Sequence, residues 1–119
     1  MPNFVVNTLS QETATIAAGA ALSGAVNLGG LRLFGLVMPA AWTAAGITFQ
    51  VSYDGGTSWS NLYDANGNEV SVTVAASRAI ALDPVTFAAI SMIKVRSGTA
   101  AAPVNQIAAA AVQLVLRSV

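Results

Sequence analysis

Hydrophobic and polar residues alternate strictly in the middle of the chain. Between residues 47 and 53 an apolar side chain occupies every second position, which is the period of a strand with one buried face. Residues 54–56 (Asp-Gly-Gly) interrupt this alternation with residue types that tolerate positive φ, so the chain can reverse there. A second extended run follows over residues 59–63. The pattern predicts a β-hairpin with its turn at the glycines.

The N-terminal third contains weaker strand patterns that are separated by glycines. Residues 1–12 are predicted to form an arm, or a short first strand over residues 4–9. The next stretch is rich in alanine, which favours helices. Its threonines and regularly placed glycines instead favour two short strands, near residues 13–18 and 21–27, joined by a turn at Gly19. A single helix over this stretch is the alternative.

Two further strands are predicted on either side of the hairpin. Residues 31–38 are apolar on both faces apart from Arg32, which predicts a central strand that is covered on both sides. Residues 39–46 follow as a loop. Beyond the hairpin, Asn66 and the glycine after it mark a tight turn, and valines alternate with polar residues over 70–74 as in a half-buried strand.

A short helical turn is predicted between the last strands. Apolar residues alternate again over residues 80–82, and then Asp83 precedes Pro84, a pairing typical of a helix N-cap and first helical position. A strand over residues 91–96 and a final strand over residues 107–117 complete the pattern.

The strand over residues 91–96 is expected to direct Ile93 and Val95 inward and Lys94 and Arg96 outward. Two interpretations of the outward pair stay open: a solvated edge, or an ion pair with a neighbouring subunit.

These strands, about eight in number, predict an all-β protein. Their spacing is typical of an antiparallel β-sandwich of the jelly-roll type, which forms a single domain over residues 13–119. No segment has the length and pattern of the helices that would cover a parallel sheet, so an α/β fold is not expected.

The hairpin turn carries a spacing motif. Ser52, Asp54, Gly56 and Trp59 have the spacing of the Asp-box, and the turn resembles that motif of sialidases and other secreted β-proteins. The resemblance implies a structural role, in which the aspartate accepts hydrogen bonds from turn amides and the tryptophan packs beneath the loop. A carboxylate that satisfies its own turn is favoured over a ligand-binding one.

The composition limits the partners and the chemistry. Of 119 residues, 55% are hydrophobic and 8% are charged, against about a quarter charged in ordinary domains. So low a charge predicts that much of the surface meets other protein. The formal net charge is zero, without a basic run, which argues against nucleic acid as a partner. Histidine and cysteine are absent, which excludes disulfides, thiolate chemistry and ordinary zinc sites.

Neither export nor membrane insertion is predicted. The first seven residues lack a basic segment followed by an apolar core, so no signal peptide is expected. The apolar run over residues 33–49 is divided by Pro39 and fits strands and turns better than a membrane span. We expect the protein to be made in a bacterial host cytoplasm and not exported by a signal peptide.

Catalytic and metal-binding interpretations are not favoured. Asp64 and Glu69 could approach each other across their turn, but at an exposed tip rather than in a glycosidase cleft. The same loop resembles a calcium site only superficially, because its glycine comes too early for an EF-hand. No histidine can activate the serines and threonines, and the single lysine lies within a strand. We expect no enzyme activity, cofactor or metal.

Surface contact is the remaining interpretation of several residues. Trp42 is a candidate interface anchor, because tryptophan is enriched at binding hot spots; a lid over the core is the alternative. Trp59 and Tyr63 share one strand face, where core packing is favoured over a carbohydrate platform. Three alanine-rich stretches predict either a thin core or, as we prefer, an apolar contact surface in a cyclic oligomer.

Two family resemblances involve longer parts of the chain. The chain is similar to the discoidin or galactose-binding jelly roll in residues 26–30, 49–59, 78–80 and 93–96. Separately, it resembles small proteins encoded among tailed-phage virion genes. That second resemblance spans most of the chain and depends on residues 38–43, 54–56, 62–64, 81–84, 96–99 and 103–106. It implies an accessory structural protein of the decoration, head-fibre or spike type.

The sequence therefore supports two hypotheses. The first is a structural component of a bacteriophage virion, a homo-oligomer such as a trimer, which contacts capsid or fibre proteins through Trp42, residues 13–25 and the loop at 97–106. That loop includes Asn105 and Gln106 as candidate contacts. The alternative is a carbohydrate-binding module in which Trp42, Asp64, Asn66 and Arg96 recognise a cell-surface glycan.

Overall fold

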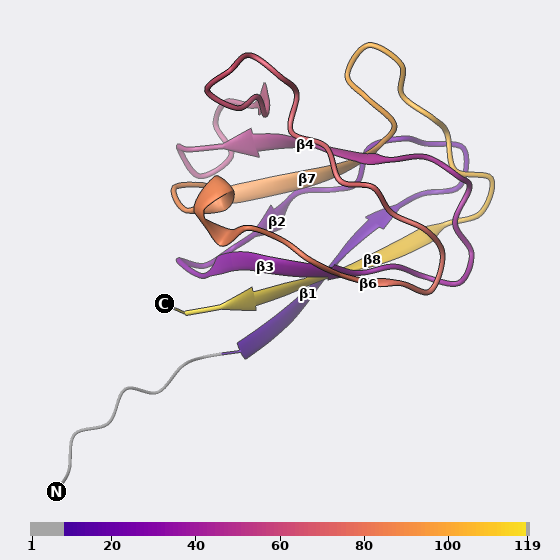
Figure 1. Cartoon of the computed structure of the whole chain (residues 1–119), viewed down its shortest axis with the longest axis horizontal. Helices are drawn as coiled ribbons and strands as arrows, with labels where there is room; N and C mark the ends of the chain where they lie inside the picture. Colours follow the sequence, from indigo (N-terminus) through magenta and orange to yellow (C-terminus); the bar gives the residue numbers. More distant parts are fainter. Residues whose placement is uncertain (1–8, 119) are drawn as a thin grey trace, which may run out of the picture.

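The computed structural model describes residues 9–118, which form two packed β-sheets (Figure 1). The described elements are β1 (Leu9–Ile16), β2 (Val26–Asn27), β3 (Arg32–Val37), β4 (Ile47–Ser52), β5 (Ser60–Asn61), β6 (Ala79–Ala81), the 3-10 helix η1 (Pro84–Phe87), β7 (Met92–Ser97) and β8 (Ala110–Arg117). No helix within residues 9–118 is long and apolar enough to cross a membrane.

The strand order is that of a jelly roll. One sheet has the order β1-β8-β3-β6 and the other has the order β2-β7-β4-β5. All neighbouring strands are antiparallel, and the pairs β1 with β8, β2 with β7, β3 with β6 and β4 with β5 are each hydrogen-bonded. This is the arrangement of one long hairpin folded over into two sheets. The predicted all-β antiparallel sandwich of about eight strands is confirmed.

The core lies between the two sheets and is built by strand alternation. On β4 the apolar side chains of Ile47, Phe49 and Val51 face the core as predicted, but Thr48 and Ser52 on the other face are buried as well, so β4 is not the half-buried strand that was expected. On β8 the alternate positions 112, 114 and 116 are buried in the same way. Phe87 from η1 closes one side of the core, with its ring edge against the Phe49 ring at a centroid distance of 5.2 Å.

The local turn and cap predictions agree with the structure. The hairpin of β4 and β5 is present, with Gln50 paired to Asn61. Asp83 caps η1, because its Oδ1 accepts a hydrogen bond from the Val85 amide, and Pro84 is the first helical residue.

The N-terminal strands differ from the prediction in their bounds. β1 begins at Leu9, before the expected start at residue 13, and residues 9–12 pair with β8; the rest of the predicted arm lies outside the described residues. No helix forms over residues 13–27, and β2 is only two residues long. The pairing is interrupted because Ser23 uses its hydroxyl, not its carbonyl, to accept the Val95 amide at 2.9 Å.

Two other strand predictions require correction. β3 is an inner strand, but it is not covered on both sides: Leu33 and Leu36 are buried, whereas Val37 is exposed on the outer face. The valines of residues 70–74 are half-buried, as expected. They form no continuous strand, because only Val72 bridges to β4, at Ile47.

Candidate functional site

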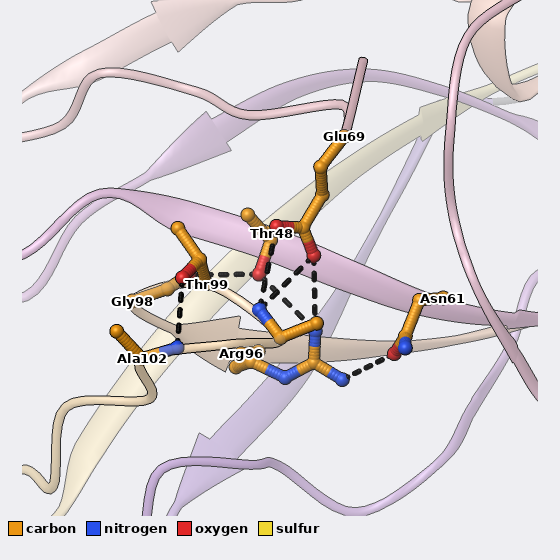
Figure 2. Close-up of polar contacts among 8 residues, drawn as sticks. Thr48, Asn61, Glu69, Arg96, Gly98, Thr99 and Ala102 are labelled. Atoms are coloured by element: carbon orange, nitrogen blue, oxygen red, sulfur yellow. Dashed lines mark hydrogen bonds and ion pairs between the residues drawn. The ribbon is translucent and has the colours of Figure 1, made fainter. Parts of the chain in front are cut away.

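A buried arginine forms a polar cluster on the outer face of the β2-β7-β4-β5 sheet (Figure 2). Arg96 projects from β7, and only 6% of its surface is exposed. Its Nη2 donates to Asn61 Oδ1 at 2.6 Å. Its Nη1 lies 3.3 Å from Glu69 Oε2 and 3.4 Å from Thr48 Oγ1. The guanidinium therefore connects β7 to β4, β5 and the turn that contains Glu69.

The same cluster holds a second loop. Both carboxylate oxygens of Glu69 accept from the Ala100 amide, at 3.1 and 3.3 Å. Thr48 donates from its hydroxyl to the Gly98 carbonyl at 2.8 Å. The loop after β7 is thus held beside Arg96 by the contacts of Glu69 with Ala100 and of Thr48 with Gly98 (Figure 2).

This geometry corrects the prediction for Arg96. The residue does lie on the outer face of its strand, but it is neither solvated nor free to pair with a neighbouring subunit, because its partner is Glu69 of the same chain. Burial of a charge is costly unless the group is paired and hydrogen-bonded, and this cluster supplies both. Sequence reasoning missed Glu69 and Thr48 as its partners.

Of the four predicted glycan-reading residues, Asp64 and Asn66 meet in one turn, whereas Trp42 and Arg96 contact other residues. Asp64 uses its Oδ1 to accept the amides of Asn66 and Asn68, at 2.9 and 3.0 Å. These contacts form the tight turn expected at that position. Arg96 lies with Glu69 instead. Within residues 9–118 no group of three or more acidic residues is placed to hold a metal ion.

A second polar network centres on Gln106, whose side chain is fully buried. Its amide nitrogen donates to the Thr43 carbonyl at 3.0 Å and to Ser97 Oγ at 2.7 Å, and its side-chain oxygen accepts the Thr43 amide at 2.7 Å. Its backbone also pairs with Gly19 and Ala20. One residue thereby joins three loops that are far apart in the sequence.

These three loops, residues 17–25, 38–46 and 98–109, are named the loop end. They contain no charged residue. Most of their outward positions are alanines, and Ile107 is 84% exposed. Trp42 is half-buried against the core, with its indole N–H donating to the Ala45 carbonyl at 3.2 Å. Asn105 is exposed beside Gln106.

The hairpin turn is held by hydrogen bonds among its own residues and by the Ser91 hydroxyl, which accepts from the Gly55 amide and donates to the Ser52 carbonyl. Asp54 accepts from the Ser58 hydroxyl at 2.6 Å, from the Ser58 amide at 3.0 Å and from the Ser52 hydroxyl at 2.7 Å. Donation by the Ser58 side chain is the largest cause that lowers the pKa of Asp54 from 3.8 to about 2. Trp59 donates from its indole to the Gly56 carbonyl at 3.1 Å. The Asp-box assignment itself stays a prediction.

The predicted core packing of Trp59 and Tyr63 is wrong, because neither side chain belongs to the core or packs against it. Trp59 is half-buried, and Lys94 Nζ lies 4.3 Å from the centroid of its ring. Tyr63 is exposed. The surface formed by residues 9–118 has no pocket, so neither aromatic lines a cleft.

The strand order of the two sheets places the chain in the class of jelly-roll β-sandwiches. No protein-family model matches the sequence, and no curated protein matches it either. Among solved structures, the chain is similar to the crystal structure of SPBc2 prophage-derived protein YomS. The TM-score is 0.56 and the identity 11%, over 99% of this chain and 100% of that chain. The likeness is therefore one of fold.

Proposed function

We propose that the chain is a structural component of a bacteriophage particle that acts through protein–protein contacts. The observation that carries this proposal is the loop end, an uncharged surface built from three separate loops and held by the buried side chain of Gln106. An exposed apolar surface of this kind is typical of a contact site. A rigid one loses little conformational entropy on binding.

The fold supports the same proposal. The similar solved structure is described as a prophage-derived protein, and the two chains match over nearly their full lengths. A decoration, head-fibre or spike-type component in a homo-oligomer is the form that we propose. The loop end then provides the repeated contact, with Trp42 and Ile107 among its apolar groups.

The carbohydrate-binding alternative is less well supported, because one of its four proposed glycan-contacting residues, Arg96, is not accessible to a ligand. Arg96 is buried and paired with Glu69, so its guanidinium cannot contact a sugar without opening the cluster. No pocket within residues 9–118 replaces it.

The test combines solution mass with binding to the phage particle. We expect purified protein to form an oligomer in light scattering across a concentration series, or to sediment with virions of the phage that encodes it. Ile107→Asp places a charge on the loop end and is expected to weaken either association about tenfold or more. Val85→Asp is the matched control, because Val85 is 72% exposed but lies on η1, at the other end of the sandwich (Figure 1).

A wild-type protein that stays monomeric and never sediments with the particle would contradict the proposal. Equal loss of binding in Ile107→Asp and Val85→Asp would place the contact elsewhere on the surface.

A further inference from the structure

Two arginines lie directly opposite each other on neighbouring strands. Arg32 on β3 pairs in register with Arg117 on β8. Directly opposite side chains on antiparallel strands have Cβ atoms about 5 Å apart and point to the same face. That face is the outer one, because the next pair in register, Leu33 and Leu116, is buried in the core. We name these two residues the arginine pair.

The arginine pair has no countercharge in the described chain. The ion pair between Arg96 and Glu69 is the one formed within residues 9–118, and no described residue gives Arg32 or Arg117 a side-chain hydrogen bond. Like charges directly opposite each other destabilise a sheet. The arrangement therefore costs the free protein stability unless something else neutralises it.

The carboxylates of the chain are committed elsewhere. Three of them hold their own turns or cap, at Asp54, Asp64 and Asp83, and Glu69 is paired with Arg96. The fifth, Glu12, alternates along β1 with the outward residues and shares the side of Ala14. Among the Asp and Glu side chains of a second copy, Glu12 is the one that is not engaged within residues 9–118.

The outward positions of β1, β8, β3 and β6 around the arginine pair carry no other charged side chain. Leu9 lies opposite Arg117 on its other side and is 64% exposed. The next row across the sheet contains Gln11, Val115, Gly35 and Ala81, of which the last two have small side chains. Small side chains allow another protein surface to approach closely, and the exposed leucine adds apolar area.

We infer that the outer face of the β1-β8-β3-β6 sheet docks a partner protein through a carboxylate-bearing segment, which the arginine pair binds. Guanidinium groups match carboxylates in bidentate geometry, while Leu9 and Val115 contact apolar atoms beside it. A nucleic acid is a poorer fit, because phosphate recognition uses a run of cations along the backbone and this face has two. The inference deepens the proposed function and rests on it, since it names the partner chemistry of a second contact surface.

The first test is an NMR titration of ¹⁵N-labelled full-length protein with acetylated, amidated tetraglutamate. The four arginine Nε–H signals are assigned with single Arg→Gln variants. We expect the Arg32 and Arg117 signals to move along one saturable curve, about threefold or more further than that of Arg78. Arg78 is the matched control, an exposed arginine without an ion pair in the described chain. Arg117→Gln should abolish the movement of the Arg32 signal.

Several results of this titration would overturn the inference. Equal movement of the Arg78 signal would indicate general screening. A tighter curve with inorganic phosphate than with tetraglutamate would indicate a phosphate ligand. Movement with increasing protein concentration alone, removed by Glu12→Gln, would identify a second copy of the chain.

A thermal measurement adds an independent readout. Because the arginine pair is repulsive in the free protein, Arg117→Gln is expected to raise the Tm by about 1–4 °C at low salt. A fall in Tm would show that Arg117 has a stabilising partner in the free protein, which contradicts the unneutralised repulsion on which the inference rests.

The final test separates this inference from the proposed function. Arg32→Gln/Arg117→Gln is compared with Ile107→Asp for sedimentation with the phage particle. Loss of binding in both variants supports the proposed function and the docking of a carboxylate-bearing segment on the arginine pair. Loss in Ile107→Asp alone overturns the docking face and leaves the proposed function intact. If wild-type protein stays monomeric and never sediments while the titration shows the expected shifts, the proposed function fails and the carboxylate site remains.

Discussion

At the scale of single residues, Asp54 holds the central hairpin turn with hydrogen bonds to its charged form. Its pKa is about 2 in the folded chain, against an ordinary value of 3.8, chiefly because Ser58 donates to it. A pKa that folding lowers means that the turn stabilises the folded state fully above pH 3.8 and loses this contribution as the pH falls through about 2.

We therefore predict that the carboxyl carbon of Asp54 titrates with a midpoint near pH 2 in an NMR pH series. Ser58→Ala removes the strongest donor and should raise the pKa of Asp54 toward 3.8. A wild-type midpoint near 3.8 would show that these hydrogen bonds are absent in solution.

Arg96 presents the opposite case, a charge that is buried and depends on its partners. Arg96→Met leaves the Glu69 carboxylate without its cation, and we expect the free energy of unfolding to fall by about 3 kcal/mol. Adding Glu69→Gln should recover part of this loss, with a coupling of about 1–2 kcal/mol. Urea denaturation of the two single variants and the double variant measures the coupling.

Arg78→Met is the control for this cycle. Arg78 is exposed and has no ion pair within residues 9–118, so its replacement should change stability by less than about 0.5 kcal/mol. Strict additivity of the Arg96 and Glu69 variants would mean that the ion pair contributes nothing.

At the scale of elements, the loop after β7 depends on one glycine. Gly98 has a φ of 87°, and a Cβ at this position would lie 2.6 Å from the Ala102 carbonyl oxygen and 2.7 Å from the Val104 nitrogen. Both neighbours are backbone atoms, which cannot move aside cheaply. The loop that reaches Glu69 and Gln106 can therefore turn only where a side chain is missing.

We predict that Gly98→Ala destabilises the protein by about 2 kcal/mol or more and weakens the Ala100 contact with Glu69. Thermal unfolding and the Ala100 amide signal measure the two effects. Gly24→Ala is the matched control, because no atom lies within 4 Å of its added Cβ. An unchanged Tm in Gly98→Ala would show that the loop adopts another conformation.

The elements also differ in how well the sequence predicts them. The alternation in β4 and β8 and the cap of η1 depend on neighbours within a few residues, so the sequence predicted them correctly. β2 was predicted too long, because Ser23 interrupts the ladder only where β7 lies beside it. Its hydroxyl resembles that of other serines until the partner strand is placed.

At the scale of the whole molecule, the jelly-roll order makes the two sheets interdependent. β1 pairs with β8, near the other end of the described chain, and every connection between consecutive strands except the β4–β5 hairpin passes from one sheet to the other. Neither sheet can assemble without the strands that precede or follow it in the other. Pairing between distant strands also predicts slow folding, in milliseconds to seconds.

We predict a single cooperative unfolding transition for both sheets. In Trp59→Phe the remaining indole, Trp42, reports on the loop end, and in Trp42→Phe the remaining Trp59 reports on the central hairpin. In each variant the urea midpoints from fluorescence and from far-UV circular dichroism should agree within about 0.2 M. An earlier fluorescence midpoint for Trp42 would show that the loop end opens independently.

By itself, the sequence determined what depends on near neighbours: the alternating strands, the turn at Asp54, the cap at Asp83 and the uncharged composition of the loops. Only the tertiary structure decided which loops meet at Gln106, which carboxylate reaches Arg96, and that Arg32 lies opposite Arg117. These contacts join residues separated by 63 positions in the case of Thr43 and Gln106, and by 27 in the case of Glu69 and Arg96. Residue type and period determine whether a side chain lies on the inner or the outer face of its strand. Which residues of distant segments it contacts there is determined only when the chain folds.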